Sequence, residues 1–139
     1  MSPFSTEAAV RLKFGLTDSA LIPQTLVAQS IDDAHAELLE SLDPACDTQG
    51  PPAALVLGET LLAGAHLFRS LASRDAFDQQ RITIGGQRIE EGARFASLMA
   101  VASLTEDRAW VLLAPFLKAC PVRNAAWTTA STPVLGESN

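Results

Sequence analysis

Two histidines are the side chains best suited to metal or acid–base chemistry in this chain of 139 residues. Asp32 and His35 are three positions apart, which places both on one face of a helix. Helical di-iron bundles need such a pair on two helices, with carboxylates from two further helices. The preceding positions that would complete a second pair with His66 hold Leu62 and Ala63. The pattern therefore favours no metal site, with His35 solvated on a helix and His66 at the edge of the core with a backbone partner.

Other reactive groups lack the neighbours that catalysis needs. Gly85-Gly86 has neither the Lys nor the following Ser or Thr of a phosphate-binding loop, and no βαβ pattern surrounds it. Cys46 and Cys120 lie far apart without metal-ligand spacing, which indicates free thiols in a reducing compartment. No Gly-x-Ser-x-Gly elbow is present for a nucleophilic serine. We expect neither catalysis nor a cofactor.

One stretch, residues 81–90, departs from the helical character of the chain and predicts a β-hairpin. β-Favouring residues flank Gly85-Gly86, and a two-residue Gly-Gly loop supplies the positive φ that a tight turn needs. Strand alternation then places Ile82, Ile84 and Ile89 on one face. A lone hairpin is marginal in water and has two unpaired edges. Its apolar face must rest on helices of its own chain, on another subunit, or on both.

Two helices are expected in the first third of the chain. A short helix over residues 5–13 has Ser5 or Thr6 as its cap and stops at Gly15. The clearest helix runs over residues 23–42, where apolar residues recur with spacings of 4, 3, 4 and 4. This predicted buried stripe consists of Val27, Ile31, Ala34, Leu38 and Leu42.

The second half is also predicted to be helical. Residues 52–74 are apolar on nearly every side, which is typical of a helix at the centre of a bundle or between subunits. Gly58 and Gly64 weaken this helix by roughly 1 kcal/mol each relative to Ala, so a close neighbouring helix would explain them. Residues 91–103 predict a third helix, and Thr105 can cap a further one, so residues 91–119 form either one bent helix or two.

The last 19 residues, 121–139, have little periodicity and many small polar groups, which predicts an extended tail. Trp127, Val134 and Leu135 are its apolar members. Trp127 is either buried within its own chain or inserted into a partner's pocket, since Trp is enriched at binding hot spots. Arg123 nearby adds to the second interpretation.

The expected fold is therefore mainly α: a small helical bundle over residues 1–120 with one β-hairpin insertion at 81–90, and an extended C-terminal tail over 121–139. The net charge is −6, and residues 1–59 hold 9 acidic and only 2 basic side chains. This balance disfavours wrapping of duplex DNA, which needs clustered Lys and Arg. We also expect no signal peptide and no membrane span, because the chain has no basic-then-apolar start and no uninterrupted apolar run of about 18 residues.

Three segments in this order carry a family resemblance. Residues 10–19 read VRLKFGLTDS and precede the acidic helix 23–42. Residues 82–89 read ITIGGQRI after the long apolar helix, and residues 112–117 read LLAPFL. Together these features cover most of residues 8–118, and the chain resembles the head-to-tail connector, or adaptor, proteins of tailed bacteriophages.

This resemblance implies a homo-oligomeric ring of twelve copies beneath the portal protein of the capsid. Such a ring extends the DNA channel, lets DNA pass without specific binding, and docks the tail-side neck or stopper protein. The implied location is the neck of the virion, after synthesis in the host cytoplasm. Subunit contacts are expected at the hairpin residues Ile82, Ile84, Arg88 and Ile89. Portal or partner contacts are expected at the tail residues Arg123, Trp127, Val134 and Leu135.

Two other classes of function stay open. A soluble helical module, such as an assembly chaperone or regulator, would use helix 52–74 to line a groove for a partner helix. A small-molecule enzyme on a helical bundle would need a core cavity with convergent polar groups, for which the chain offers His66. The role of His66 and of the two cysteines is not determined by the sequence.

Overall fold

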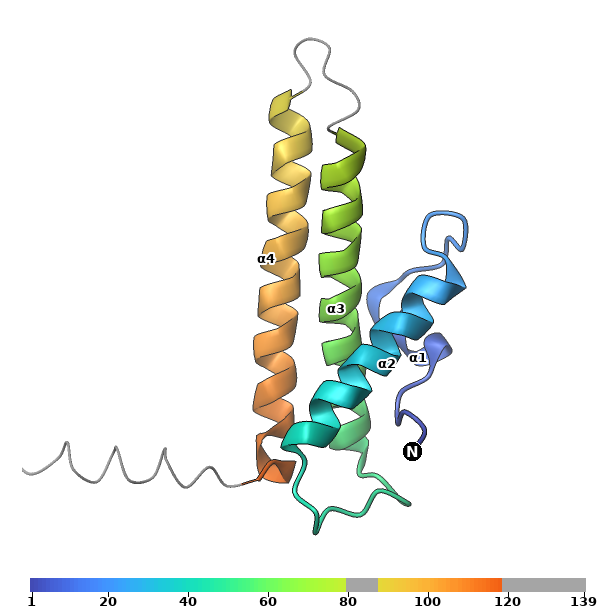
Figure 1. Ribbon diagram of the computed structural model, residues 1–139, viewed down its shortest axis with the longest axis vertical. Helices are drawn as coiled ribbons and strands as arrows, with labels where there is room; N and C mark the ends of the chain where they lie inside the picture. Colours follow the sequence, from blue (N-terminus) through green and yellow to red (C-terminus); the bar gives the residue numbers. More distant parts are fainter. Residues whose placement is uncertain (80–87, 119–139) are drawn as a thin grey trace, which may run out of the picture.

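The computed structural model describes the backbone of residues 1–79 and 88–118 and the side chains of residues 1–78 and 94–118. Within these residues the chain is mainly helical, in the order α1 (Glu7–Phe14), α2 (Gln24–Ser41), α3 (Ala53–Gln79), α4 (Arg88–Leu113) and the 3-10 helix η1 (Ala114–Phe116). α3 and α4 lie side by side as a long pair, and α1 and α2 pack on the lower half of α3 (Figure 1). α3 contacts all three other helices, which confirms its predicted central position.

The local signals predicted for α1 are confirmed. The Thr6 side chain accepts a hydrogen bond from the Ala9 backbone N–H at 3.2 Å, which caps the helix start. Gly15 ends the helix with φ of 66°, a left-handed conformation that glycine adopts without steric cost. The loop that follows is held by Asp18, whose side chain accepts from the backbone N–H groups of Ala20 and Leu21.

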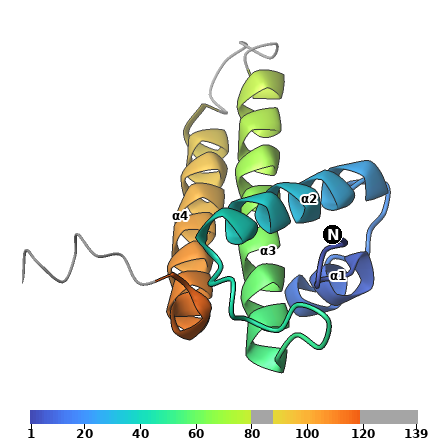
Figure 2. The ribbon, with the colours of Figure 1, turned by 60° about the horizontal axis from the view of Figure 1, so that its bottom comes forward.

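The apolar stripe of α2 is also confirmed, since its five predicted residues are all buried. α2 crosses α3 obliquely and ends beside the lower end of α4 (Figure 2). There Leu42 forms an isolated antiparallel bridge with Leu117. Two backbone hydrogen bonds of 2.9 Å flank the bridge, from Asp43 N–H to the Phe116 carbonyl and from Lys118 N–H to the Ser41 carbonyl.

α4 is one continuous helix from Arg88 to Leu113, which decides between the one-helix and two-helix alternatives that the sequence left open here. The Thr105 hydroxyl donates to the Val101 carbonyl at 2.7 Å, one turn back along the same helix. A threonine that bonds in this way continues a helix rather than capping a new one. Pro115 lies in the 3-10 turn that ends the helical segment, as its missing N–H requires.

The second predicted strand is wrong over Arg88, Ile89 and Glu90, because these residues form the first turn of α4. Their β-favouring alternation is short, and a helix satisfies its backbone hydrogen bonds within one segment, without a partner strand. Residues 81–87 of the predicted hairpin lie outside the described residues. The predicted tail over 121–139 lies outside them as well.

The core consists of two apolar clusters. The larger one joins α1, α2, α3 and α4, and the second lies at the lower end, where α2 meets the ends of α3 and α4. Trp110 packs against both clusters. Gly58 faces Leu113, and Gly64 faces the Phe14 ring, so closely that a Cβ at either position would overlap them. The predicted close approach at both glycines is thus confirmed.

Candidate functional site

A buried polar network joins the N-terminal segment, α2 and α3. The Glu59 side chain is fully buried, and its two oxygens accept from the Ser5 backbone N–H at 2.9 Å and from Nδ1 of His35 at 3.0 Å. The Thr60 hydroxyl donates to the Val56 carbonyl at 2.8 Å. Because a hydroxyl has one proton, the Ser5 hydroxyl is then the donor in its 2.9 Å hydrogen bond to Thr60. The network satisfies both oxygens of a carboxylate that has no contact with water.

Ser5, His35 and Glu59 are the residue types of a hydrolytic triad, but their arrangement differs from one. Nε2 of His35, which would receive the proton of a nucleophile, is buried and has no hydrogen-bond partner among the described residues. The Ser5 hydroxyl instead points to Thr60. The Phe4 ring lies edge-on to His35, with ring centroids 5.1 Å apart. Since a nucleophile must reach its base, this network is suited to fastening the N-terminal segment rather than to catalysis.

The prediction that His35 is solvated is therefore wrong. Its partner Glu59 is 24 residues away in the sequence, and only folding brings the two together. Asp32, the other member of the candidate metal pair, is exposed on α2. Within the described residues, no group of three or more potential ligands could hold a metal ion.

His66 lies at the edge of the core, but its predicted backbone partner is replaced by a carboxylate. Nε2 of His66 is 2.8 Å from Oε2 of Glu37, which links α3 to α2. The two side chains are 26% and 39% exposed. This pairing gives His66 a structural role in holding α2 against α3.

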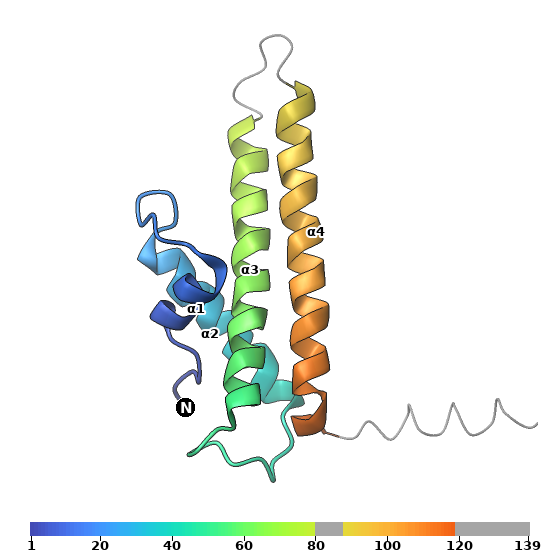
Figure 3. The same cartoon turned by 180° about the vertical axis from the view of Figure 1, so that it is seen from behind.

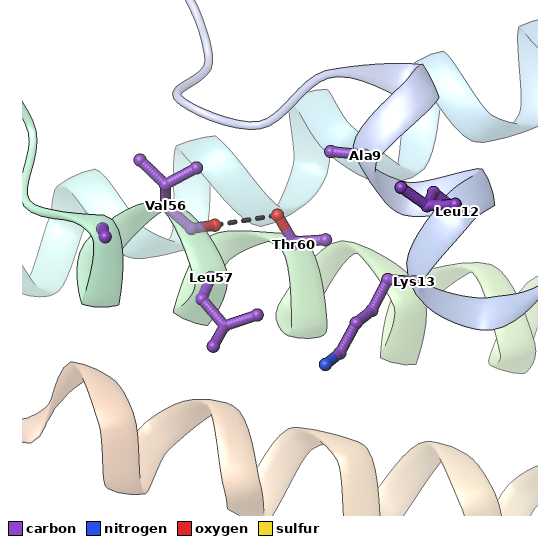
Figure 4. Close-up of a pocket in the computed structure, with 7 residues that line it drawn as sticks. Ala9, Leu12, Lys13, Val56, Leu57 and Thr60 are labelled. Atoms are coloured by element: carbon purple, nitrogen blue, oxygen red, sulfur yellow. Dashed lines mark hydrogen bonds between the residues drawn. The ribbon is translucent and has the colours of Figure 1, made fainter.

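A shallow apolar groove of about 650 Å³ lies between α1 and the first two turns of α3. Figure 3 shows α1 beside the lower half of α3. Leu12, 86% exposed, forms one side of the groove, and Leu57 forms part of the other. Thr60 turns its hydroxyl towards the Val56 carbonyl (Figure 4), which leaves its methyl group as lining. The groove is completed by Ala9, Lys13, Ala53 and Val56.

A second exposed surface, apolar apart from Asp107, follows α4. Ala100, Leu104, Asp107 and Val111 recur with spacings of 4, 3 and 4, and all four are exposed. We call these four residues the α4 stripe. Leu104 and Val111 are 70% and 74% exposed, although the same spacing in α2 marks a buried face. The periodicity was visible in the sequence, but whether a neighbour covers that face was not.

The structure does not bring the predicted contact residues together into a described site. Arg88 and Ile89 lie in the first turn of α4, where only their backbone is described. The other predicted hairpin and tail contacts lie outside the described residues: Ile82, Ile84, Arg123, Trp127, Val134 and Leu135. The α4 stripe was not predicted, and a groove on helix 52–74 was expected only under the alternative in which this helix binds a partner helix.

By length and composition, α3 could cross a membrane over Ala53–Asp78. The rest of the molecule buries 61% of the apolar window in that segment, as expected of a central helix.

Comparison with protein-family models, with curated proteins and with solved structures finds no match to the chain.

Proposed function

We propose that the chain is a structural subunit of a bacteriophage neck. In this proposal, copies form a ring of twelve beneath the portal protein, extend the DNA channel and dock the tail-side neck or stopper protein. The phage assignment rests on the resemblance in residues 10–19, 82–89 and 112–117. Self-assembly is supported by one structural observation, the exposed α4 stripe.

Covering the α4 stripe with a partner would be energetically favourable. Leu104 and Val111 lie two turns apart on the outer side of α4 and leave most of their apolar surface in water. Covering one such side chain fully contributes about 1.5–3 kcal/mol. Apolar residues that form a contiguous exposed surface, rather than lying singly, mark contacts with other molecules.

The charge distribution suits a conduit better than a DNA-binding protein. Residues 1–59 carry most of the acidic excess, and this segment contains α1 and α2. An acidic surface would repel a passing duplex instead of gripping it. In the proposed ring, the tail residues Arg123, Trp127, Val134 and Leu135 contact the portal, and the segment containing Ile82, Ile84, Arg88 and Ile89 contributes to subunit contacts.

Native mass spectrometry and electron microscopy of the purified protein test the proposed ring. We expect closed rings of twelve identical subunits around an open channel, because two unlike contact surfaces related by rotation close into a ring. In an intact particle, the same ring should lie between the portal and the tail. Two-fold dimers as the largest assembly would contradict the proposal.

A soluble helical module that binds a partner protein is the second candidate. The observation that favours it is the groove between α1 and α3, whose mostly apolar lining suits the apolar face of a partner helix. Quantitative mass spectrometry of mature particles separates the two candidates. A connector stays in the particle at a fixed copy number, whereas an assembly chaperone leaves before maturation.

A further inference from the structure

We propose that the two exposed apolar surfaces of this chain bind each other between copies, so that the α4 stripe of one copy lies in the α1–α3 groove of the next. This inference rests on the proposed ring and names the surfaces that build it. The occupant of the groove is thus a second copy of the same chain, presenting one face of a helix.

The dimensions of the two surfaces agree. On α3, the groove extends from Ala53 to Thr60, and on α4 the two large apolar side chains of the stripe are Leu104 and Val111. Both pairs are seven residues apart, which corresponds to about 10 Å along a helix. A volume of about 650 Å³ accommodates several aliphatic side chains. Two turns of α4 can therefore fill the groove along its length.

The charges at the two surfaces are complementary. Lys13 lies at the edge of the groove, and its side chain extends to the same side of α3 as that of Leu57 (Figure 4). Asp107 lies within the stripe, between Leu104 and Val111. Neither Lys13 nor Asp107 belongs to any of the ion pairs found among the described residues. Seating the stripe in the groove provides each charge with an opposite one, which favours this register over others.

In the proposed ring the contact is heterologous, because each copy uses its groove towards one neighbour and its stripe towards the other. The groove belongs to α1 and α3, whereas the stripe lies on α4. A subunit that binds one neighbour through its groove still presents its free stripe to another. Contacts of this kind continue from copy to copy until the rotation closes a ring.

Three matched Leu→Asp variants of the full-length protein test this pairing. Leu12→Asp places a charge in the groove, Leu104→Asp places one in the stripe, and Leu21→Asp places one on neither surface. These residues are 86%, 70% and 62% exposed, so each substitution should leave the fold intact, as circular dichroism can verify. We expect the groove variant and the stripe variant each to remain monomeric by mass photometry, and the control Leu21→Asp to assemble like the unaltered chain.

Mixing the groove variant Leu12→Asp with the stripe variant Leu104→Asp gives the decisive measurement. The stripe variant retains its groove, the groove variant retains its stripe, and one intact contact can form between them. We expect a one-to-one pair that does not grow further. Self-association of Leu12→Asp alone would show that α4 stripes pack against each other, and this result would overturn the pairing. The pairing would also be overturned if Leu12→Asp or Leu104→Asp assembled as well as the unaltered chain.

The outcomes separate the pairing from the proposed ring. If the unaltered chain forms rings but the mixture gives no pair, the pairing is wrong and the ring stands. If the mixture gives the pair but the unaltered chain stops at a two-fold dimer, the pairing holds and the ring is wrong. If the unaltered chain stays monomeric and the mixture gives no pair, both are wrong.

Charge reversal provides a second measurement of the same contact. Lys13→Glu and Asp107→Lys should each weaken assembly by a few-fold, on the order expected for one partly exposed ion pair. The double variant restores opposite charges across the contact and should recover most of the lost affinity. If the double variant is as weak as the single variants combined, these two charges do not face each other.

Discussion

At the scale of single residues, Glu59 joins three parts of the chain that are distant in sequence. One oxygen holds the backbone at Ser5, and the other holds the ring of His35 on α2. Because the carboxylate is fully buried, each of these hydrogen bonds replaces one that water would otherwise make. The N-terminal segment is further held where the ring of Phe4 packs against His35.

Replacement of Glu59 by Ala should therefore cost much more stability than loss of an exposed carboxylate. The change leaves the Ser5 N–H and the His35 ring N–H buried without an acceptor, and we expect a loss of about 3 kcal/mol in the free energy of unfolding. Urea denaturation followed by circular dichroism measures it. The matched control is Glu37→Ala, which removes the half-exposed partner of His66 and should cost under about 1 kcal/mol. Equal losses in the two variants would refute the structural importance of the network.

At the scale of elements, the positions of glycine in α3 reflect the close packing of neighbouring helices. At its two glycines, side chains of other elements approach its backbone closely. At Gly64, the neighbour is the Phe14 ring at the end of α1, and that ring is held in an edge-on contact with Phe68, with centroids 5.1 Å apart. The intrinsic weakness of glycine in a helix is thus offset by the close packing of α1 on α3.

Gly64→Ala should consequently destabilise the protein although alanine favours helices. A Cβ at this position overlaps the Phe14 ring, and overpacking of this kind costs about 1–3 kcal/mol, against a propensity gain of about 1 kcal/mol. A double-mutant cycle with Phe14→Ala isolates the effect. Once the ring is gone, Gly64→Ala should become stabilising. Stabilisation by Gly64→Ala in the unaltered chain would show that the ring moves aside freely.

At the scale of the whole molecule, the C-terminal end of the described helical region is fastened to the end of α2. The segment after α4 returns to the end of α2, where Leu42 pairs with Leu117. Phe116 and Leu117 pack against the second core cluster. Lys118 adds a hydrogen bond from its ammonium group to the Glu40 carbonyl at 3.0 Å. The upper part of the α3–α4 pair, in contrast, extends beyond α1 and α2 (Figure 1).

Two truncations distinguish the contribution of this fastening segment from that of the residues beyond it. A chain ending at Lys118 keeps every contact described above and should retain the full free energy of unfolding. A chain ending at Leu113 loses the packing of Phe116 and Leu117 and should be less stable by about 2–4 kcal/mol. Thermal and urea denaturation of the two chains provide the comparison. Equal stability of the two chains would show that residues 114–118 contribute nothing measurable to the free energy of unfolding.

Local signals in the sequence determined much of the helical architecture. Thr6 and Gly15 delimit α1 through hydrogen bonds and backbone angles that involve only neighbouring residues. The stripe of α2 and the glycines of α3 predicted which faces are packed, because helical periodicity places such residues on one side. Thr105 left two alternatives open, since a threonine can cap a new helix or bond back along a continuing one, and its sequence surroundings do not distinguish the two.

Only the tertiary structure decided the partners and the exposure of side chains. His35 is buried because Glu59 reaches it from another helix, and no local pattern encodes that contact across 24 residues. Likewise, the spacing of Leu104 and Val111 equals that of a buried stripe, yet both are exposed because no described element packs on the outer side of α4. A sequence specifies which face of a helix is apolar through its period, but what covers that face depends on how distant segments are arranged in space.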